Sequence, residues 1–182
     1  MEFSLRSPSP ADFEIVASWI SDAKACSRWA GPQVPFPFSS VELPAHIHAT
    51  DTNTFCLSAE KEDLLGFAQY FDKGNGVVRL ARVIVSPACR GQGLGKILCA
   101  LVIERALTSL KVESFSLGVY RDNPAAIATY SELGFSVVED QSTEERLTMA
   151  LQANPSIQGT PEKLRFSVPS RLRRSVAPDL ER

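Results

Sequence analysis

The chain has 182 residues, of which 44% are hydrophobic and 22% are charged, values close to the average for a soluble globular protein. This composition excludes a disordered, collagenous or disulfide-dense chain, and the length favours one domain around a single core. The net charge of −2 creates no overall field that would recruit nucleic acid or an anionic membrane, and no apolar run approaches the roughly 20 residues of a membrane span.

The first fifty residues are predicted to form one short strand followed by helices. Apolar residues recur at helical spacing at Phe13, Val16 and Ile20, after a Ser-Pro-Ser-Pro turn. Ser39 or Ser40 is expected to cap a later helix. The predicted elements are a strand at 2–6, helices starting after residue 10 and at 23–29, an extended proline-rich loop at 33–38, and a short helix after residue 40.

From residue 54 to residue 151, strand patterns alternate with helix patterns. Residues 77–85 are rich in β-branched side chains, which is typical of a central strand. Asn123 and Pro124 start a helix that Gly134 ends. The predicted elements are strands at 55–59, 64–71, 77–85, 114–120, 135–138 and 146–151, a charged hairpin turn at 60–63, and helices at 95–110 and 125–133. We therefore expect one α/β or α+β domain over residues 1–154, with helices on the faces of a sheet.

Residues 155–182 differ in composition from the rest of the chain. They hold four prolines and six basic against three acidic residues, which gives a net charge of +3 in a chain whose total is −2. We expect a flexible basic tail. An arm that binds a polyanion or a protein partner is the alternative.

The cysteines indicate a reducing compartment. Cys26, Cys56, Cys89 and Cys99 lie far apart without a Cys-x-x-Cys pair, and most sit in apolar patterns. Reduced thiols are therefore expected rather than a disulfide framework or a metal site. The start of the chain has no apolar stretch of signal-peptide length, so we expect a cytoplasmic protein.

The segment 83–96 (VIVSPACRGQGLGK) leads from a strand through a glycine-rich turn into a helix. Gly91, Gly93 and Gly95 have no Cβ atom that would keep a ligand away from the backbone, and the first N–H groups of the helix are exposed. The partial positive charge of the helix start and two nearby basic side chains favour an anion. The turn is therefore predicted to bind phosphate.

Two other phosphate motifs do not fit this turn. A P-loop needs four residues between its first glycine and its Gly-Lys pair, followed by Ser or Thr, whereas three residues separate Gly91 from Gly95 and Ile97 follows Lys96. A dinucleotide-binding Gly-x-Gly-x-x-Gly turn belongs to a parallel strand-helix-strand unit, whereas this Gly-x-Gly-x-Gly turn follows predicted antiparallel hairpins. Neither of these folds is favoured.

The sequence RGQGLG at 90–95 is similar to the coenzyme A signature of the GNAT N-acetyltransferase superfamily. That signature reads Gln or Arg, two free positions, Gly, one free position, then Gly or Ala. The family's second motif appears downstream, with Asn123, Ala126, Tyr130 and the pair Gly134-Phe135. The chain thus resembles a GNAT N-acetyltransferase over residues 2–151. The resemblance implies a mixed, mostly antiparallel sheet with helices on both faces and a splayed central strand.

The resemblance also implies that the chain binds acetyl-CoA as a cosubstrate. The central strand would hold the pantetheine arm and the glycine-rich turn would hold the diphosphate. The implied cofactor-binding residues are Val83, Ile84, Val85, Arg90, Gly91, Gln92, Gly93, Leu94, Gly95, Lys96, Asn123 and Ala126. Asn123 would touch the pantetheine, act as a plain N-cap, or both. No metal site is expected, because His46 and His48 point to different faces of their predicted helix.

Tyr130 resembles the family's catalytic tyrosine, which protonates the departing thiolate. A phenol with a pKa of about 10 stays protonated at neutral pH and can donate to a sulfur anion, although a core tyrosine stacked on the sheet is the alternative. The strand at 77–85 carries no carboxylate, so the general base is unassigned. The candidates, each also explicable as a surface residue, are Glu42, Asp72, His46 and His48.

The predicted function is transfer of an acetyl group from acetyl-CoA to a primary amine by direct attack in a ternary complex. The acceptor is expected to meet Trp29, the Pro-Phe-Pro-Phe loop at 35–38 and Tyr70, although these aromatic residues equally fit a cap over the core. The alternatives are an acyl-CoA sensor without catalysis and an acetyltransferase for a protein N-terminus. No nucleic-acid or membrane partner is expected, and both a monomer and a homodimer are left open.

Overall fold

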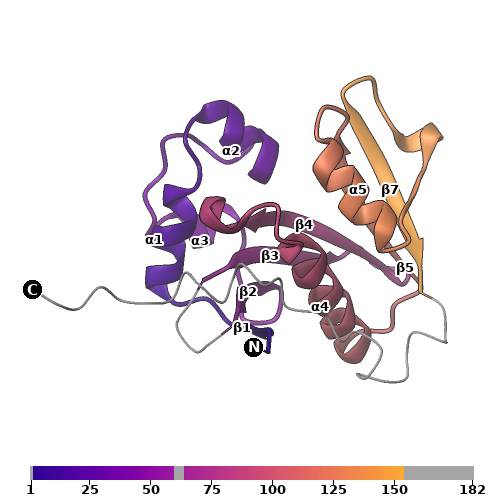
Figure 1. Cartoon of the computed structure of the whole chain (residues 1–182), viewed down its shortest axis with the longest axis horizontal. Helices are drawn as coiled ribbons and strands as arrows, with labels where there is room; N and C mark the ends of the chain where they lie inside the picture. Colours follow the sequence, from indigo (N-terminus) through magenta and orange to yellow (C-terminus); the bar gives the residue numbers. More distant parts are fainter. Residues whose placement is uncertain (1, 60–63, 154–182) are drawn as a thin grey trace, which may run out of the picture.

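The computed structural model describes residues 2–59 and 64–153, which form one sheet with helices on both faces (Figure 1). The seven strands lie in the order β1-β2-β3-β4-β5-β7-β6. They are β1 (Ser4–Arg6), β2 (Thr54–Ser58), β3 (Gly66–Asp72), β4 (Val77–Val85), β5 (Ser114–Tyr120), β6 (Ser136–Val137) and β7 (Arg146–Gln152). Neighbouring strands are antiparallel except β4 and β5, which are parallel. The sheet is therefore mixed and mostly antiparallel, as expected.

The helices bury two separate apolar cores against the two faces of the sheet. They are α1 (Pro10–Ser18), α2 (Ala23–Ala30), α3 (Leu43–His46), α4 (Leu94–Ser109) and α5 (Pro124–Glu132). Along β2, Phe55 and Leu57 pack with α4, whereas Cys56 between them packs with α1, because successive strand residues point to opposite faces. No helix within 2–59 and 64–153 is long and apolar enough to cross a membrane.

The order of elements predicted from the sequence is confirmed, with one wrong helix cap. Neither Ser39 nor Ser40 caps α3, which begins at Leu43 with Glu42 at its N-cap. Ser39 instead exchanges hydrogen bonds with Glu42 and closes a turn before the helix, with 2.7 Å from Ser39 Oγ to Glu42 Oε2. Pro44 explains the late start, because proline is tolerated in the first turn of a helix and not further inside. The predicted turn at 60–63 and the predicted tail at 155–182 lie outside the described residues.

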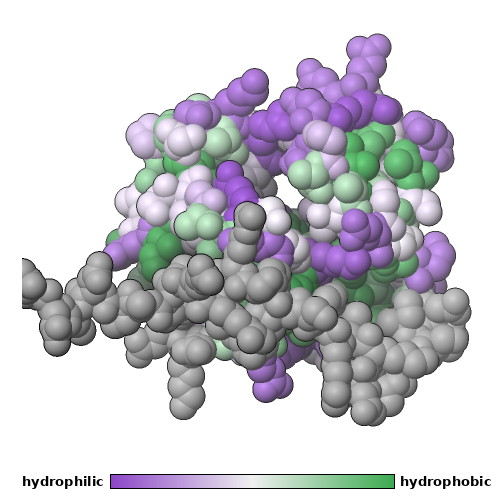
Figure 2. Space-filling model, viewed as in Figure 1, coloured by the Kyte–Doolittle hydropathy of each residue, from purple (hydrophilic) through white to green (hydrophobic). Residues whose placement is uncertain are grey.

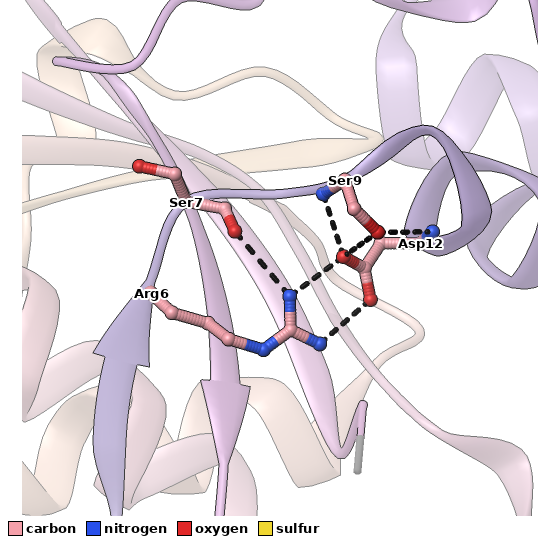
Figure 3. Close-up of polar contacts among 4 residues, drawn as sticks. All are labelled: Arg6, Ser7, Ser9 and Asp12. Carbon is pink, nitrogen blue, oxygen red and sulfur yellow. Dashed lines mark hydrogen bonds and ion pairs between the residues drawn. The ribbon is translucent and has the colours of Figure 1, made fainter. Parts of the chain in front are cut away.

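A buried ion pair joins β1 to α1 (Figure 3). Arg6 donates two hydrogen bonds to Asp12, from Nη1 to Oδ2 at 2.6 Å and from Nη2 to Oδ1 at 2.7 Å. Asp12 also accepts a hydrogen bond from the backbone N–H of Ser9 at 2.7 Å, within a capping box at the start of α1. Burial opposes ionisation of Asp12, but the hydrogen bonds from Arg6 and Ser9 outweigh it and lower the pKa of this carboxyl to about 2. The pair fixes the chain where it leaves the sheet to build the α1–α3 layer.

Candidate active site

The strands β4 and β5 diverge inside the sheet and leave a gap between them. They pair only over Val77 to Arg79 on β4, opposite Ser114 to Ser116 on β5. Beyond these residues β4 pairs only with β3, whereas β5 pairs with β7 as far as Tyr120. Figure 1 shows β4 and β5 running apart, with α5 and β7 on the side of β5. One edge of β4 over 80–85 therefore presents backbone N–H and C=O groups that no described strand pairs with.

A β-bulge at Arg82 bends β4 at the level of this gap. The register between β3 and β4 shifts between Phe67 and Gln69, and Arg82 has a φ of 51°, in the left-handed region. Side chains from helix α2 and strand β3 form hydrogen bonds with Arg82 at the bulge. Trp29 donates from Nε1 to the Arg82 carbonyl at 2.9 Å, and the Arg82 guanidinium donates to Gln69 Oε1 at 2.9 Å. The position of this bulge depends on contacts between distant segments, so no local sequence pattern predicts it at Arg82.

The glycine-rich turn after β4 presents backbone donors to open space. Gly91 and Gly93 have φ values of 74° and 78°, a conformation that other residues adopt only at a cost. A Cβ atom at either position would meet no atom within 4 Å. Within the described residues, no backbone N–H from Gly91 to Gly95 has an acceptor, because α4 begins at Leu94 and its first turn is uncapped. The turn therefore offers a set of unpaired N–H groups at a helix N-terminus, which suits an anion.

A cavity of about 310 Å³ lies in the gap, between the end of β4, the glycine-rich turn, α4 and α5. It is mostly apolar, and its polar groups are exposed backbone and the side chains of Arg90, Thr129 and Tyr130. The residues that line it are Val83, Ile84, Val85, Cys89, Arg90, Gly91, Gly93, Leu94, Gly95, Cys99, Ala125, Ala126, Thr129 and Tyr130. An apolar wall beside backbone donors fits a long thiol carrier that ends in a diphosphate.

Tyr130 is the buried titratable residue that faces this cavity from α5. Its ring packs edge-on against Phe135, with 6.0 Å between the ring centroids. Burial raises the pKa of the Tyr130 phenol, and the neighbouring Cys99 raises it further. The phenol is thus protonated at any physiological pH and can only donate its proton to a strong base formed beside it. Burial also raises the pKa of the Cys99 thiol, to about 12.

Most of the residues predicted from the sequence to bind acetyl-CoA line this one cavity, and three do not. Lys96 forms an ion pair with Glu132 at 2.9 Å, and Asn123 caps α5 by accepting from the Ala126 backbone N–H at 3.2 Å. The third is Gln92, whose Oε1 is buried without a hydrogen-bond partner in the described residues. The sequence reasoning missed Cys89, Cys99, Ala125 and Thr129. Cys99 follows Gly95 by one helical turn, and Thr129 follows Ala125 in the same way, so helical spacing could have found both.

The candidate general bases do not lie in the cavity. Glu42 accepts hydrogen bonds from Ser39, which lower the pKa of its carboxyl, and Asp72 lines a separate cavity together with Tyr70. Among the described residues that line the 310 Å³ cavity, none is Asp, Glu or His. Trp29 packs with Phe67 in the core on the α1 side of the sheet, whereas Tyr70 packs in the core on the α4 side, so the two residues do not share the expected acceptor cleft.

Another cavity, of about 480 Å³, lies between α2, the end of β5 and the loop before β7. Figure 2 shows the surface hollowed between the two halves of the molecule, with hydrophilic residues along the rim. Arg28 on α2 spans the hollow to Asp122, with 2.9 Å between Nη1 and Oδ2, and its guanidinium lies 4.3 Å from the centre of the Tyr120 ring. The lining residues are Lys24, Ser27, Arg28, Tyr120, Arg121, Asp122, Glu144 and Glu145. This cavity is charged, in contrast to the first.

Comparison with known proteins gives one family. Residues 21–135 match the model of the acetyltransferase (GNAT) family. The spermidine N(1)-acetyltransferase of Vibrio cholerae is 24% identical over 147 residues, which cover 79% of this chain and 84% of that protein. The N-acetyltransferase 9-like protein of Nematostella vectensis is 24% identical over 78 residues, or 43% of this chain, and the match spans 39% of that relative.

A solved structure shows the same fold. The spermidine N-acetyltransferase of Vibrio cholerae in complex with CoA and spermine superimposes with a TM-score of 0.66 at 17% identity, over 82% of this chain and 95% of that chain. This likeness confirms the fold expected from the sequence, a mixed and mostly antiparallel sheet with helices on both faces and a splayed central strand.

Proposed function

Because the chain belongs to the acetyltransferase (GNAT) family, we propose that it transfers an acetyl group from acetyl-CoA to a primary amine. Acetyl-CoA supplies a thioester, whose C–S bond breaks as the amine nitrogen forms an N–C bond, and the thiolate released takes up a proton. The observation that carries the proposal is the glycine-rich turn, with unpaired N–H donors beside the unpaired edge of β4. The diphosphate of acetyl-CoA would accept hydrogen bonds from the N–H groups of the turn. The amide-rich pantetheine arm would pair with the N–H and C=O groups on the edge of β4.

The proposed binding residues divide by the part of acetyl-CoA that they would hold. The N–H groups of Gly91 to Gly95 would hold the diphosphate, with support from the Arg90 side chain and the positive end of the α4 dipole. Backbone groups of Val83 to Val85 would pair with the pantetheine arm as a strand pairs with its neighbour. Ala126, at the start of α5, would close the cavity over this arm. Lys96 would bind the diphosphate only after exchanging its carboxylate partner, because its ammonium is paired with Glu132.

Tyr130 is the proposed proton donor to the thiolate. Its phenol lines the cavity, and its raised pKa keeps it protonated until a strong base appears next to it. A thiolate released in a dry cavity is such a base, so the proton moves as the C–S bond breaks. A backbone N–H on the free edge of β4 would stabilise the oxyanion that forms on the thioester carbonyl.

We further propose that the attacking amine loses its own proton to solvent. The cavity lining offers no carboxylate or imidazole to accept it, and the four candidate bases lie elsewhere or are bonded elsewhere. Catalysis then rests on positioning a neutral amine against the thioester, together with the proton donor and the oxyanion donor.

Calorimetric titration with acetyl-CoA and a thiol-release assay with a panel of amines test the proposal. Gly93→Val introduces a β-branched side chain at a φ of 78°, where it would occupy the space above the turn. We expect the Kd for acetyl-CoA to rise by at least about tenfold, because the side chain blocks the N–H groups. Binding without thiol release from any amine would favour an acyl-CoA sensor over an enzyme.

Gly74→Val is the matched control for this experiment. Gly74 has a φ of 80°, also with no atom within 4 Å of a Cβ atom, but it lies in the turn between β3 and β4. Both variants carry the same backbone strain, about 1–2 kcal/mol, so they should lose similar stability. Equal affinity for acetyl-CoA in the two variants would show that the glycine-rich turn is not the binding site.

A further inference from the structure

The sheet has a polar face opposite the cavity, at the level where β4 and β5 diverge. On β5, Leu117 and Val119 belong to the core that α4 covers, so Gly118 and Tyr120 point to the other face. Register places Arg79 opposite Ser116, and Arg146 opposite Tyr120. The side chains of Arg79, Gly118 and Arg146 therefore share this opposite face, beside the gap.

Two guanidinium groups meet over Gly118. A Cβ atom at this residue would lie 2.7 Å from Arg146 Nη2 and 3.1 Å from Arg79 Nη2. Gly118 does not have a positive φ, so the backbone conformation does not require glycine there. The missing side chain instead makes room for the two arginines. Burial lowers the pKa of Arg79, and the neighbouring charge of Arg146 lowers it further, which reports how close the two cations lie.

These two arginines have no anionic partner in the described part of the chain. Neither guanidinium donates a hydrogen bond or lies within 4.0 Å of a carboxylate there, and the Arg146 guanidinium lies 5.1 Å from the centre of the Tyr120 ring. The neighbouring arginines are different, because Arg28 is bonded to Asp122 and Arg82 to Gln69. Two adjacent, half-buried cations without an anionic partner among the described residues repel each other, which costs stability unless an anion binds between them.

The pair lies where an acceptor would reach the gap. Gly118 stands two residues beyond Ser116, the last β5 residue paired with β4, so the guanidiniums lie roughly 7 Å along the strand from the point of divergence. Tyr120, which Arg146 contacts, lines the hydrophilic 480 Å³ cavity between α2 and β7. A molecule that enters through that cavity would pass these arginines before its amine reached the gap from the face opposite α4.

We propose that Arg79 and Arg146 bind an oxyanion on the acceptor, so that the substrate class is a primary amine that also carries a carboxylate or a phosphoryl group. This inference rests on the proposed function and specifies its acceptor. Guanidinium groups bind such oxyanions through charge-assisted, often paired hydrogen bonds. A polyamine, the class named for the relative from Vibrio cholerae, would bring further positive charge to the pair and be repelled.

Three acceptors of equal length test the inference with the full chain and acetyl-CoA. Hexylamine, hexanediamine and ω-aminohexanoate differ only in the far end, which is neutral, cationic or anionic, and phosphoethanolamine compared with ethanolamine tests the phosphoryl group. We expect kcat/KM for an anionic acceptor to exceed that of its neutral counterpart by about tenfold, and the diamine to be poorer still. Preference for the diamine or for hexylamine would overturn the inference.

Arg79→Gln and Arg146→Gln should each remove most of this preference. They should raise KM for ω-aminohexanoate about tenfold, while KM for hexylamine and for acetyl-CoA stays the same. Arg105→Gln is the control, because this exposed arginine lies on α4 at the opposite face. Equal effects on charged and neutral acceptors would show that the two arginines serve stability alone.

The outcomes separate this inference from the proposed function. Thiol release from hexylamine without any preference for anions would remove the inference and keep the acetyltransferase. If no amine releases thiol, the proposed function fails, and calorimetric titration of ω-aminohexanoate into the CoA-bound protein still decides whether the arginines bind an oxyanion. Binding that the Arg79→Gln variant loses would support the site, and absence of binding would refute it.

Discussion

The two cavities beside the β4–β5 gap are built by different means. The apolar cavity is made largely by one continuous segment, 83–95, and it offers backbone N–H groups to its ligand. The hydrophilic face opposite is made by side chains from three distant elements, with Arg28 on α2, Arg79 on β4 and Arg146 on β7. The difference teaches that a site made of backbone groups can be read from one local segment, whereas a site made of side chains from several elements exists only once the tertiary fold brings them together.

The largest expected effect comes from removing the proposed proton donor on the apolar side, Tyr130. Tyr130→Phe should lower kcat by about 100-fold or more, because the thiolate then leaves without a proton, while the Kd for acetyl-CoA stays the same. Steady-state kinetics and calorimetry measure the two quantities. Tyr120→Phe removes the same hydroxyl on the opposite face and should leave kcat within a few-fold. Equal losses in the two variants would contradict the assigned roles.

The pH dependence of the reaction rate tests whether the protein supplies a general base for the amine. If the amine loses its proton to solvent, kcat/KM rises about tenfold per pH unit below the pKa of the amine and is constant above it. Acceptors with different amine pKa values should therefore shift the profile by that difference. An inflection near pH 6 to 7 that is the same for all acceptors would instead reveal a base on the protein.

Cysteine labelling tests whether the cofactor binds in the apolar cavity, and it does not depend on catalysis. Cys89 is half-buried in the wall of the apolar cavity, whereas Cys26, Cys56 and Cys99 are buried. Burial raises the pKa of Cys56 and of Cys99 to about 12, so both thiols should resist alkylation. Mass spectrometry should find Cys89 labelled first, and acetyl-CoA, whose sulfur is acylated and does not consume the reagent, should slow that labelling by roughly tenfold at ten times its Kd. Labelling of Cys89 at an unchanged rate would place acetyl-CoA elsewhere.

A substitution at Asp12, which is remote from both cavities, should lower stability and leave the binding of both ligands unchanged. The pKa of Asp12 is lowered from 3.8 to about 2 in the folded chain, so its contribution to stability is present above pH 4 and is lost as the pH falls from about 4 to about 2. Asp12→Asn should therefore lower the free energy of unfolding by roughly 2 kcal/mol at neutral pH and flatten its dependence on pH in that window.

Urea unfolding at several pH values measures this effect. Asp22→Asn is the control, because Asp22 also accepts a helix-capping hydrogen bond, at 2.8 Å from the Ala25 N–H, but it is exposed and pairs with no arginine of residues 2–59 and 64–153. Asp22→Asn should lower the free energy of unfolding by less than Asp12→Asn does. A profile for Asp12→Asn that still falls as steeply as the wild type below pH 4 would contradict the assigned role of the ion pair.

The apolar cavity was easier to predict from the sequence than the hydrophilic face, because one local segment builds most of the first and distant elements build the second. The turn at 90–95 and the start of α5 were predictable because glycine spacing and an Asn-Pro N-cap act within one short segment. The meeting of Arg79 and Arg146 over Gly118 was not, because it depends on the register of β7 against β5 and on where β4 leaves the sheet. The late start of α3 was missed because Pro44 mattered more than the two serines before it.

The amide region of the NMR spectrum during titration with acetyl-CoA tests the central claim most directly. If unpaired backbone donors hold the diphosphate, the amide proton resonances of Gly91, Gly93 and Gly95 should move downfield as they gain an acceptor. The resonance of Gly74 should stay in place, because this glycine lies in another turn, between β3 and β4. Saturation of binding with the three turn glycines unmoved would contradict the account.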